Sequence, residues 1–322
     1  MAHQQRNSLN SLTSHSPRIV VLGSINMDLV LRCDTLPVAG QTLIAQSSSE
    51  FCGGKGANQA VAASLAGGNV AMLGAVGDDA FATRLVDNMK MHEVDCDGVQ
   101  RFPEAASGLA VIAVDAVGQN SIMVVPGANS QLSTNSVQAA ETRIKESDCL
   151  IMQLEIPSET ILEGISIARR HGVRVVLDPA PAPAELIPSL LQVDLICPNE
   201  TEATDLTQMP VTNTTEAKAA AKKLQALGAK NVVITMGSQG ALLLQDDDAT
   251  IVPAVPVDAI DTTAAGDAFA GALAVRWAQT GDLLNAVRFA NAAGAIAASR
   301  TGAQNSIGTK QEIDVAMLRQ AK

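Results

Sequence analysis

The run from Asp261 to Leu273 combines two acidic residues with a turn of small residues at the predicted start of an apolar helix. The first N–H groups of a helix lack partners within the helix, and the helix dipole adds partial positive charge, so this turn suits an anion. Ala264, Ala265 and Gly266 would supply those groups, with Asp267 within reach of a hydroxyl group brought to the anion. The pattern favours phosphoryl transfer with Asp267 as general base. The simpler alternative is an acid that only complements the helix dipole.

Three glycines flank Lys55 in the segment Phe51–Ala60, ahead of a helix predicted over 58–66. The segment is not a Walker A phosphate loop, because Lys55 is followed by glycine rather than by serine or threonine. The paired glycines could act as a hinge and let backbone amides approach a polyol, while Asn58 offers a donor and an acceptor to hydroxyl groups. A glycine turn with a purely structural role is the alternative.

Polar residues follow several apolar runs that are predicted to be buried parallel strands. Asn26 and Asp28 come after the run 18–23, and Glu155 comes after the run 149–153. The carboxyl ends of parallel strands meet at the edge where open α/β sheets bind ligands. Asn26 and Asp28 could hold adjacent sugar hydroxyl groups there, and a capped turn in contact with water is the alternative.

Two further strand ends suit a nucleotide. Asn199 and Glu202 are three residues apart, so on a helix they would share a face and could organise Mg²⁺ waters and phosphate oxygens. The same two residues could instead form a capping box. The loop from Thr235 to Gly240 contains two glycines and could lie against a nucleotide.

Short apolar runs alternate with helical patterns along most of the chain, which predicts βαβ units and a mainly parallel sheet. The segment 41–51 and a hairpin pattern at 109–125 break this alternation, and we expect them to form a small sheet that projects as a lid. The expected strands of the main sheet are 18–23, 70–74, 149–153, 173–177, 194–197 and 231–235, and the expected helices include 58–66, 158–170, 216–227, 266–279, 283–300 and 310–319.

The composition argues against several classes of function. Aromatic residues make up 2% of the chain and the formal net charge is −11, which opposes binding to nucleic acids or anionic membranes. The five cysteines are scattered without a Cys-x-x-Cys pair, so neither a zinc site nor a disulfide framework is indicated. We therefore expect a cytoplasmic protein with reduced thiols. Residues 1–17 are predicted to be a disordered tail, with only a faint resemblance to a transit peptide.

Phe51–Ala60 and Asp261–Leu273 together resemble the two signature segments of the ribokinase-like (PfkB-type) carbohydrate kinases. The similarity extends over nearly all of residues 18–322. This resemblance implies a single three-layer αβα domain over 18–322, with a mainly parallel central sheet and lid strands at about 29–51 and 105–127. It also implies a homodimer formed through the lid.

By the same resemblance, the chain is expected to phosphorylate D-ribose at its 5-hydroxyl group with ATP, Mg²⁺ and an activating K⁺. Asp267 would be the base, and the turn from Ala264 to Asp267 would be the anion hole. The expected sugar ligands are Asn26, Asp28, Gly54, Lys55, Gly56, Ala57, Asn58, Glu155 and Asp267. The expected nucleotide ligands are Asn199, Glu202, Thr235, Gly237, Ser238, Gly240, Gly266 and Asn291. The positions that match the family's potassium site are Asp261, Thr263, Ala297, Arg300, Gly302 and Ser306.

Two positions depart from the family's pattern, because Asn291 stands where relatives carry histidine and Asn305 where a proline is common. A related kinase that acts on 2-deoxyribose, another pentose or a nucleoside is the nearest alternative function. A non-catalytic sugar-binding regulator would have lost Asp267 or the glycine turn, and both are present. A dinucleotide-dependent dehydrogenase is disfavoured, because no Gly-x-Gly-x-x-Gly follows the first strand.

Overall fold

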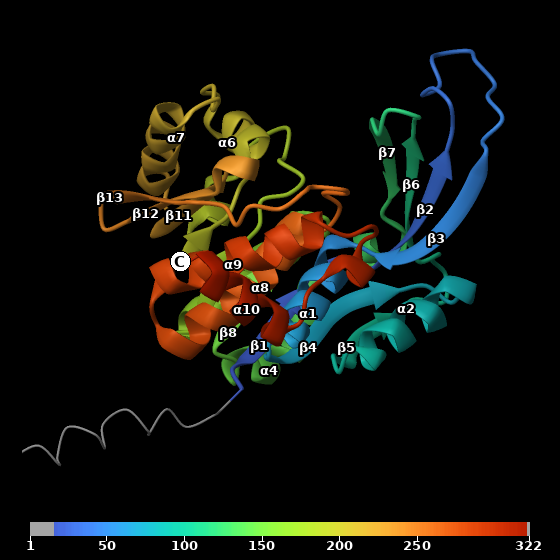
Figure 1. Ribbon diagram of the computed structural model, residues 1–322. Coiled ribbons are helices and arrows are strands. Elements are labelled where there is room, and N and C mark those ends of the chain that lie inside the picture. The colour runs from blue at the N-terminus through green and yellow to red at the C-terminus, as the bar shows by residue number, and fades with distance from the viewer. Residues whose placement is uncertain (1–15, 321–322) are drawn as a thin grey trace, which may run out of the picture.

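A computed structural model of the chain describes residues 16–320. The tail predicted over 1–17 lies outside these residues, except for Ser16 and Pro17. The described chain forms one large sheet with helices on both faces and one small sheet beside it (Figure 1). This arrangement confirms the predicted α/β architecture with a mainly parallel central sheet and a small separate sheet. None of the described helices combines the length and the apolar composition needed to cross a lipid bilayer.

The large sheet has nine strands in the order β13-β12-β11-β10-β9-β8-β1-β4-β5. All neighbouring pairs from β11 to β5 are parallel, whereas β12 and β13 pair antiparallel at one edge. The chain leaves β1 towards β4 and later returns to its other side with β8, which creates the type of crevice where open α/β sheets bind ligands. The strands are β1 Arg18–Leu22, β4 Asn69–Val76, β5 Asp95–Arg101, β8 Cys149–Met152, β9 Arg174–Leu177, β10 Leu195–Ile196, β11 Asn231–Thr235, β12 Ala241–Gln245 and β13 Asp248–Val252.

Helices cover the two faces of the large sheet and bury both sides of its central strands. In β1, Ile19 and Val21 pack into one apolar core and Val20 and Leu22 into the other. Burial on both faces explains why this strand is a continuous apolar run rather than an alternating one. The first core is shared with α1 Lys55–Leu65, α2 Ala80–Met91, α8 Ala265–Thr280, α9 Leu283–Ala298 and α10 Lys310–Gln320, and the second with α3 Thr134–Ala139, α4 Glu141–Lys145, α5 Ser158–His171, α6 Glu200–Thr207 and α7 Thr214–Ala226.

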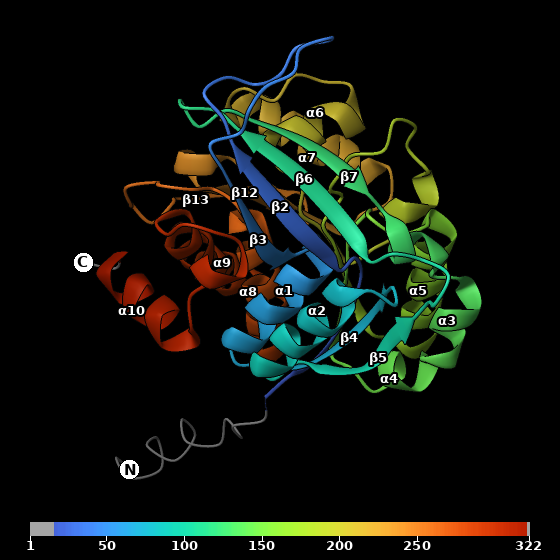
Figure 2. The ribbon, with the colours of Figure 1, turned by 90° about the vertical axis from the view of Figure 1, so that its right-hand side faces the viewer.

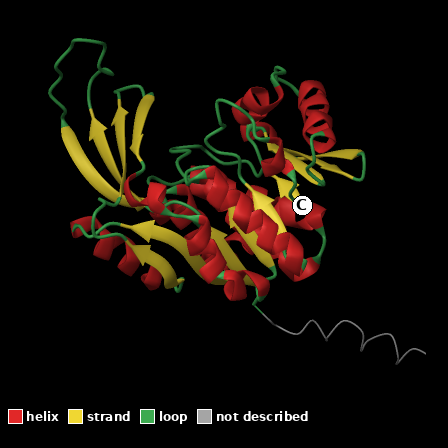
Figure 3. Ribbon diagram, turned by 180° about the vertical axis from the view of Figure 1, so that it is seen from behind, coloured by secondary structure: helices red, strands yellow, loops and turns green. Residues whose placement is uncertain are grey.

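The small sheet has the strand order β3-β2-β6-β7, and Figure 2 shows its four strands side by side. Seen from behind, it stands apart from the strands of the large sheet (Figure 3). The hairpin predicted at 109–125 is present as the antiparallel pair β6–β7. All residues of β7 are exposed, including the apolar residues 122–125. The strands are β2 Asn26–Arg32, β3 Ser47–Gly53, β6 Gly108–Val114 and β7 Asn120–Val125.

Several boundaries differ from the sequence prediction. The small sheet already begins at Asn26, and residues 41–46 precede β3 without belonging to a strand. Strand β5 and helix α2 were not predicted. Strand β5 lies at the edge of the sheet and is polar, so it has no apolar run that would mark it in the sequence. The pair β12–β13 was missed as well, since its strands follow β11 without an intervening long helix.

Candidate active site

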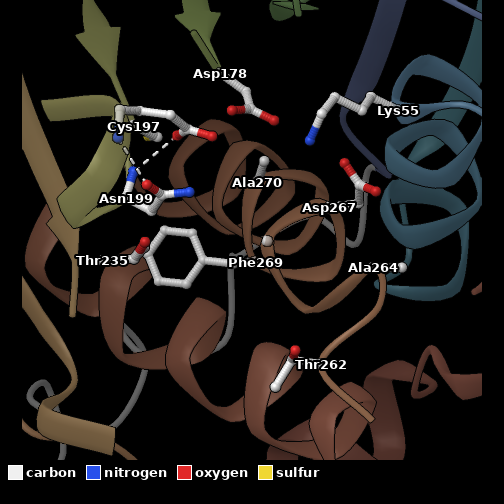
Figure 4. Close-up of a pocket in the computed structure, with 12 residues that line it drawn as sticks. Lys55, Asp178, Cys197, Asn199, Thr235, Thr262, Ala264, Asp267, Phe269 and Ala270 are labelled. Atoms are coloured by element: carbon white, nitrogen blue, oxygen red, sulfur yellow. Dashed lines mark hydrogen bonds between the residues drawn. The ribbon is translucent and has the colours of Figure 1, made fainter. Parts of the chain in front are cut away.

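A cavity of about 220 Å³ lies between the carboxyl ends of β9, β10 and β11 and the first turns of α1 and α8 (Figure 4). Seven residues predicted to bind sugar, nucleotide or phosphate line it, so the fold brings together segments that are far apart in sequence. The cavity is lined by Lys55, Asp178, Cys197, Asn199, Glu202, Thr235, Thr262, Ala264, Gly266, Asp267, Phe269 and Ala270.

The turn before α8 presents free amide groups to this cavity. Ala264 adopts a left-handed backbone with φ of 57°, a conformation that costs a non-glycine residue on the order of 1 kcal/mol. The N–H of Ala265 donates to the carbonyl oxygen of Thr262 at 3.2 Å, so this predicted anion donor is already engaged. Within residues 16–320, the N–H groups of Gly266 and Asp267 have no hydrogen-bond partner, and a side chain at Gly266 would meet nothing within 4 Å. The donors left free for an anion therefore include Gly266 and Asp267 but not Ala265.

The packing of α8 against α1 fixes the position of Asp267. A Cβ atom at Gly271 would lie 2.7 Å from the Cβ of Ala62, so only glycine allows the two helices to approach this closely. As a result, Asn58 and Gln59 of α1 reach the carboxylate of Asp267 with hydrogen bonds of 2.9 and 3.0 Å. The carboxylate is buried and held in one orientation.

Lys55 is the positive charge of the cavity, and its amine points towards Asp178 and Asp267 (Figure 4). Burial lowers the pKa of Lys55, but the attraction of Asp178, Asp267, Glu155 and Glu202 outweighs burial and raises the pKa above its ordinary value. Burial also raises the pKa of Asp178 to about 7, although Lys55 opposes this shift. The cavity can therefore hold an added negative charge only close to Lys55 and the free amides of α8.

Two predicted sugar ligands, Asn26 on β2 and Glu155 after β8, form hydrogen bonds with other residues of the protein. The amide group of Asn129 donates to Oδ1 of Asn26 at 2.7 Å, and both residues are buried. Oε2 of Glu155 accepts the hydroxyl of Ser24 at 2.5 Å and the N–H of Lys55 at 3.3 Å. These side chains are thus positioned before any ligand binds.

The glycines at 53 and 54 allow β2 and the start of α1 to meet. A Cβ atom at Gly53 would lie 2.1 Å from a carboxylate oxygen of Asp28, and one at Gly54, where φ is 87°, would lie 2.6 Å from the N atom of Asn26. Burial, reinforced by repulsion from Glu155 and Asp267, raises the pKa of Asp28 to about 7. These glycines therefore have a packing role, and a hinge at this position stays a prediction.

Asn199 and Glu202 form the capping box that was one of their two sequence interpretations. The N–H of Glu202 donates to the side chain of Asn199, and the N–H of Asn199 donates to the side chain of Glu202, each at 2.9 Å. Burial raises the pKa of Glu202 above its ordinary value. Both residues also line the cavity, and their role beside Mg²⁺ and phosphate stays a prediction.

The remaining predicted nucleotide residues lie outside the lining of the cavity. Gly237 and Ser238 form an exposed turn after β11, and Gly240, with φ of 92°, leads into β12. The buried side chain of Asn291 donates to the carbonyl oxygens of Val252 and Pro253 at 3.0 and 3.1 Å. Asn291 therefore fastens the segment after β13, and its contact with a nucleotide stays a prediction.

Most residues predicted for the potassium site lie on two loops that meet at Asp261, and Ala297 lies at the end of α9. The carboxylate of Asp261 accepts the N–H groups of Thr263 and Gly302, each at 2.9 Å. Burial raises the pKa of Asp261, but these hydrogen bonds outweigh burial and lower the pKa below its ordinary value. The hydroxyl of Ser306 donates to the carbonyl of Ala303 at 2.7 Å. Ala297 lies in the last turn of α9, where its carbonyl accepts the N–H of Arg300 at 3.1 Å, and a cation site beside Asp261 stays a prediction.

Comparison with known proteins assigns the family. The model of the pfkB family of carbohydrate kinases matches residues 16–310. The chain belongs to this family. It is 40% identical to the deoxyribokinase of Salmonella typhi over 89% of this chain and 94% of that protein, and 39% identical to the ribokinase of Haemophilus influenzae over 91% and 96%. The structure of Arabidopsis thaliana ribokinase complexed with ribose and ATP superposes with a TM-score of 0.87 at 29% identity, covering 94% of this chain and 99% of that chain.

As a pfkB-family kinase, the protein transfers phosphate to a sugar hydroxyl group. The cavity provides what this chemistry requires: a buried carboxylate, free amides at a helix start and a lysine that neutralises negative charge. Asn26, Asp28 and Glu155 do not line the cavity, but Asp28 and Glu155 lie close enough to Lys55 or Asp267 to shift pKa values.

Several residues of the site were not assigned a role from the sequence, and three of them form side-chain hydrogen bonds there. Gln59 is fully buried and its Nε2 lies 2.7 Å from Asp178 and 3.0 Å from Asp267. Gln304 reaches Asn58 from the loop before α10. Asp178 follows the apolar strand β9, so the rule that singled out Glu155 and Asn199 could have found it. No comparable sequence signal marks Gln59 or Gln304, because only tertiary packing brings Gln59 to Asp267 and Gln304 to Asn58.

Proposed function

We propose that this kinase transfers the γ-phosphoryl group of ATP to the 5-hydroxyl group of D-ribose, with Asp267 as the general base. The observation that supports this role most directly is the buried, doubly hydrogen-bonded carboxylate of Asp267 next to the free amides of Gly266 and Asp267. The ribokinases among the relatives support ribose as the acceptor.

In the proposed reaction, Asp267 takes the proton of the 5-hydroxyl group of the sugar. At the same time, the oxygen of this hydroxyl group bonds to the γ-phosphorus of ATP. The bond between that phosphorus and the β–γ bridging oxygen breaks, and ADP leaves. The amides at the start of α8 and the amine of Lys55 stabilise the charge on the transferring group. Asn199 and Glu202 would face the Mg²⁺ that accompanies ATP, and this ion would neutralise phosphate charge.

Replacing the base tests this proposal. Asp267→Asn keeps the shape of the side chain but removes the proton acceptor, so kcat should fall by a factor on the order of 10²–10⁴ while ribose and ATP still bind. A coupled assay for ADP release measures kcat, and calorimetry measures binding. The exposed acid Asp205 on α6 offers a control, and Asp205→Asn should retain full turnover. Near-normal turnover of Asp267→Asn would reject Asp267 as the base.

The acceptor could instead be 2-deoxyribose, because a relative at 40% identity is a deoxyribokinase. A site built for ribose contains a polar group that pairs with the 2-hydroxyl group, and leaving such a group buried and unpaired costs about 1–3 kcal/mol. Ribose should therefore have a kcat/KM about 10- to 100-fold higher than 2-deoxyribose. Equal values, or a preference for 2-deoxyribose, would favour the second function.

Potassium activation is proposed for the loops that meet at Asp261. The carboxylate of Asp261 is ionised and ties residues 261–263 to Gly302, so a cation there would stiffen the turn that leads to α8. Replacing K⁺ by Na⁺ should lower kcat, and indifference to this exchange would remove the site from the proposal.

We also propose that the small sheet closes over the sugar and pairs two subunits in a cytoplasmic enzyme. Closure would exclude water, so that ATP is not hydrolysed in place of transfer to the sugar. The exposed apolar side chains of Ile122, Met123, Val124 and Val125 on β7 would be covered by a second copy of the chain. Sedimentation analysis should find a dimer, and a monomer at micromolar concentration would contradict this arrangement.

A further inference from the structure

A chain of three side-chain amides leads from helix α2 to the carboxylate of Asp267. Asn88 donates to Oε1 of Gln304, Nε2 of Gln304 donates to Oδ1 of Asn58 at 3.1 Å, and Nδ2 of Asn58 donates to Oδ2 of Asp267 at 2.9 Å. Gln304 and Asn58 are buried, whereas Asn88 is only half-buried. The three amides come from α2, from the loop before α10 and from α1, so they meet only in the folded protein.

The direction of this chain follows from the chemistry of a carboxylate. An ionised Asp267 can only accept hydrogen bonds, so Asn58 must turn its NH₂ group towards Asp267 and its oxygen towards Gln304. Gln304 must then donate to Asn58, and its own oxygen faces Asn88, which donates in turn. Each bond aligns the amide dipole of the next residue towards the carboxylate, which strengthens the whole chain.

Gln304 is the middle member and fixes which way the Asn58 amide faces. Without the donor at Gln304, the oxygen of Asn58 would lose its partner, and only the hydrogen bond to Asp267 would still hold the Asn58 amide in this orientation. Any rotation of the loosened amide would bring its oxygen towards Asp267, where two oxygens repel each other at the position of the base. Asn88 and Gln304 both line a second cavity of about 180 Å³, but Gln304 is only 5% exposed whereas Asn88 is half-buried. Water can therefore replace the partner of Asn88 more easily, and Asn88 is the less critical end.

We propose that Gln304 is a positioning residue for phosphoryl transfer, acting through Asn58 on the orientation of Asp267. This role rests on the proposed function of Asp267 as the base. Gln304 would touch neither the sugar nor ATP, and it would link the loop at residues 300–306 to the reacting carboxylate. Loss of the Gln304 donor should therefore lower kcat and leave the KM for ATP unchanged.

The test is a double-mutant cycle in the full-length enzyme with ribose and ATP. Gln304→Met keeps a similar length but removes the donor, and it should lower kcat by about tenfold with the KM for ATP within a factor of two. In an Asn58→Ala background, the same substitution should change kcat by less than twofold, because its target is already absent. Equal factors in both backgrounds would show that Gln304 does not act through Asn58 and would overturn the proposal.

A second variant covers the outcome in which Gln304→Met does not fold. Gln304→Glu keeps the shape and the acceptor for Asn88 but removes the donor to Asn58, so the same cycle should give the same non-additive loss of kcat. Unchanged kcat in whichever variant folds, as judged by circular dichroism and melting temperature, would also overturn the proposal.

A control variant and a comparison with Asp267→Asn separate this inference from the proposed function on which it rests. Asn305 is exposed on the same loop and its side chain has no hydrogen-bond partner within the described residues, so Asn305→Ala should leave kcat unchanged. If Asp267→Asn is inactive while Gln304→Met and Gln304→Glu are fully active, only the positioning role fails. If Asp267→Asn itself turns over normally, the proposed function fails first.

Discussion

Beside the cavity, the proposed sugar ligands Asn26, Asp28 and Asn58 are buried, and Asn26 and Asn58 are held by other side chains. On the proposed nucleotide side, Gly237 and Ser238 are exposed. Side chains that are already held lose little conformational freedom when a ligand binds, whereas an exposed loop must be ordered at that moment. We therefore expect side-chain positions to be most precise where the hydroxyl group must meet the base, and substitutions at the nucleotide contacts to be tolerated better.

The largest effect that would test this comparison is expected at Lys55, the only described cation lining the cavity. Lys55→Met removes the charge that offsets Asp178, Asp267, Glu155 and Glu202, and kcat/KM for ribose should fall by about 100-fold or more. Steady-state kinetics measures the change. Lys90→Met, at an exposed lysine of α2, is the control and should leave kcat/KM unchanged. A loss below tenfold at Lys55 would contradict the preorganised sugar side.

The same substitution can be made once on each side. Ser24 is fully buried and donates to Glu155 at 2.5 Å, whereas Ser238 is exposed. Ser24→Ala should raise the KM for ribose about tenfold, because a hydrogen bond to a charged group is lost. Ser238→Ala should raise the KM for ATP by no more than about threefold, since water can replace its hydroxyl group. Equal effects would remove the distinction between the two sides.

The smallest effect concerns stability and pH. The pKa of Asp28 is raised from an ordinary value of 3.8 to about 7, mainly by burial, so between these pH values the folded protein holds a proton that the unfolded chain has lost. Stability contributed by this proton is therefore lost as pH rises from about 4 to 7. Asp28→Asn stays neutral, and it should show a smaller fall in urea midpoint between pH 5 and pH 8 than the parent protein.

Asp178 contributes a pH dependence of the same sign, because burial also raises its pKa to about 7, and it stays in place in Asp28→Asn. A partial rather than a complete loss of the pH dependence is therefore expected. Ser238→Ala contains no change in a titrating group and should keep the full difference in urea midpoint. An unchanged difference in Asp28→Asn would show that Asp28 does not carry a proton in the folded state.

Local patterns in the sequence were sufficient to predict the central strands of the large sheet and the start of α8. The run Arg18–Leu22 is buried on both faces, which produces a continuous apolar segment, and Asp267 lies in the first turn of a helix as its small neighbours indicate. Both features depend on residues close together in the chain. The polar edge strand Asp95–Arg101 lacks such a pattern, and its pairing with β4 is decided by the sheet as a whole.

The site was only partly predictable, because its contacts join residues that are far apart in the sequence. Asn58 and Asp267 were both selected from their motifs, but their direct hydrogen bond was not foreseen, because 209 residues separate them. Gln59 and Gln304 were missed altogether. Asn291 and Ala265 were chosen as ligand residues, yet the structure shows that they already hydrogen-bond to backbone carbonyls.

The sequence by itself determined the family, the α/β architecture and the acid at the start of α8, because short segments encode helices, strands and turns through local hydrogen bonding and apolar spacing. Only the tertiary structure decided which partners surround that acid. The close approach of α1 and α8 at Gly271 brings Asn58 and Gln59 to the carboxylate, and the loop that carries Gln304 adds a donor to Asn58. Such contacts depend on how whole elements pack, and no local pattern in the chain specifies them.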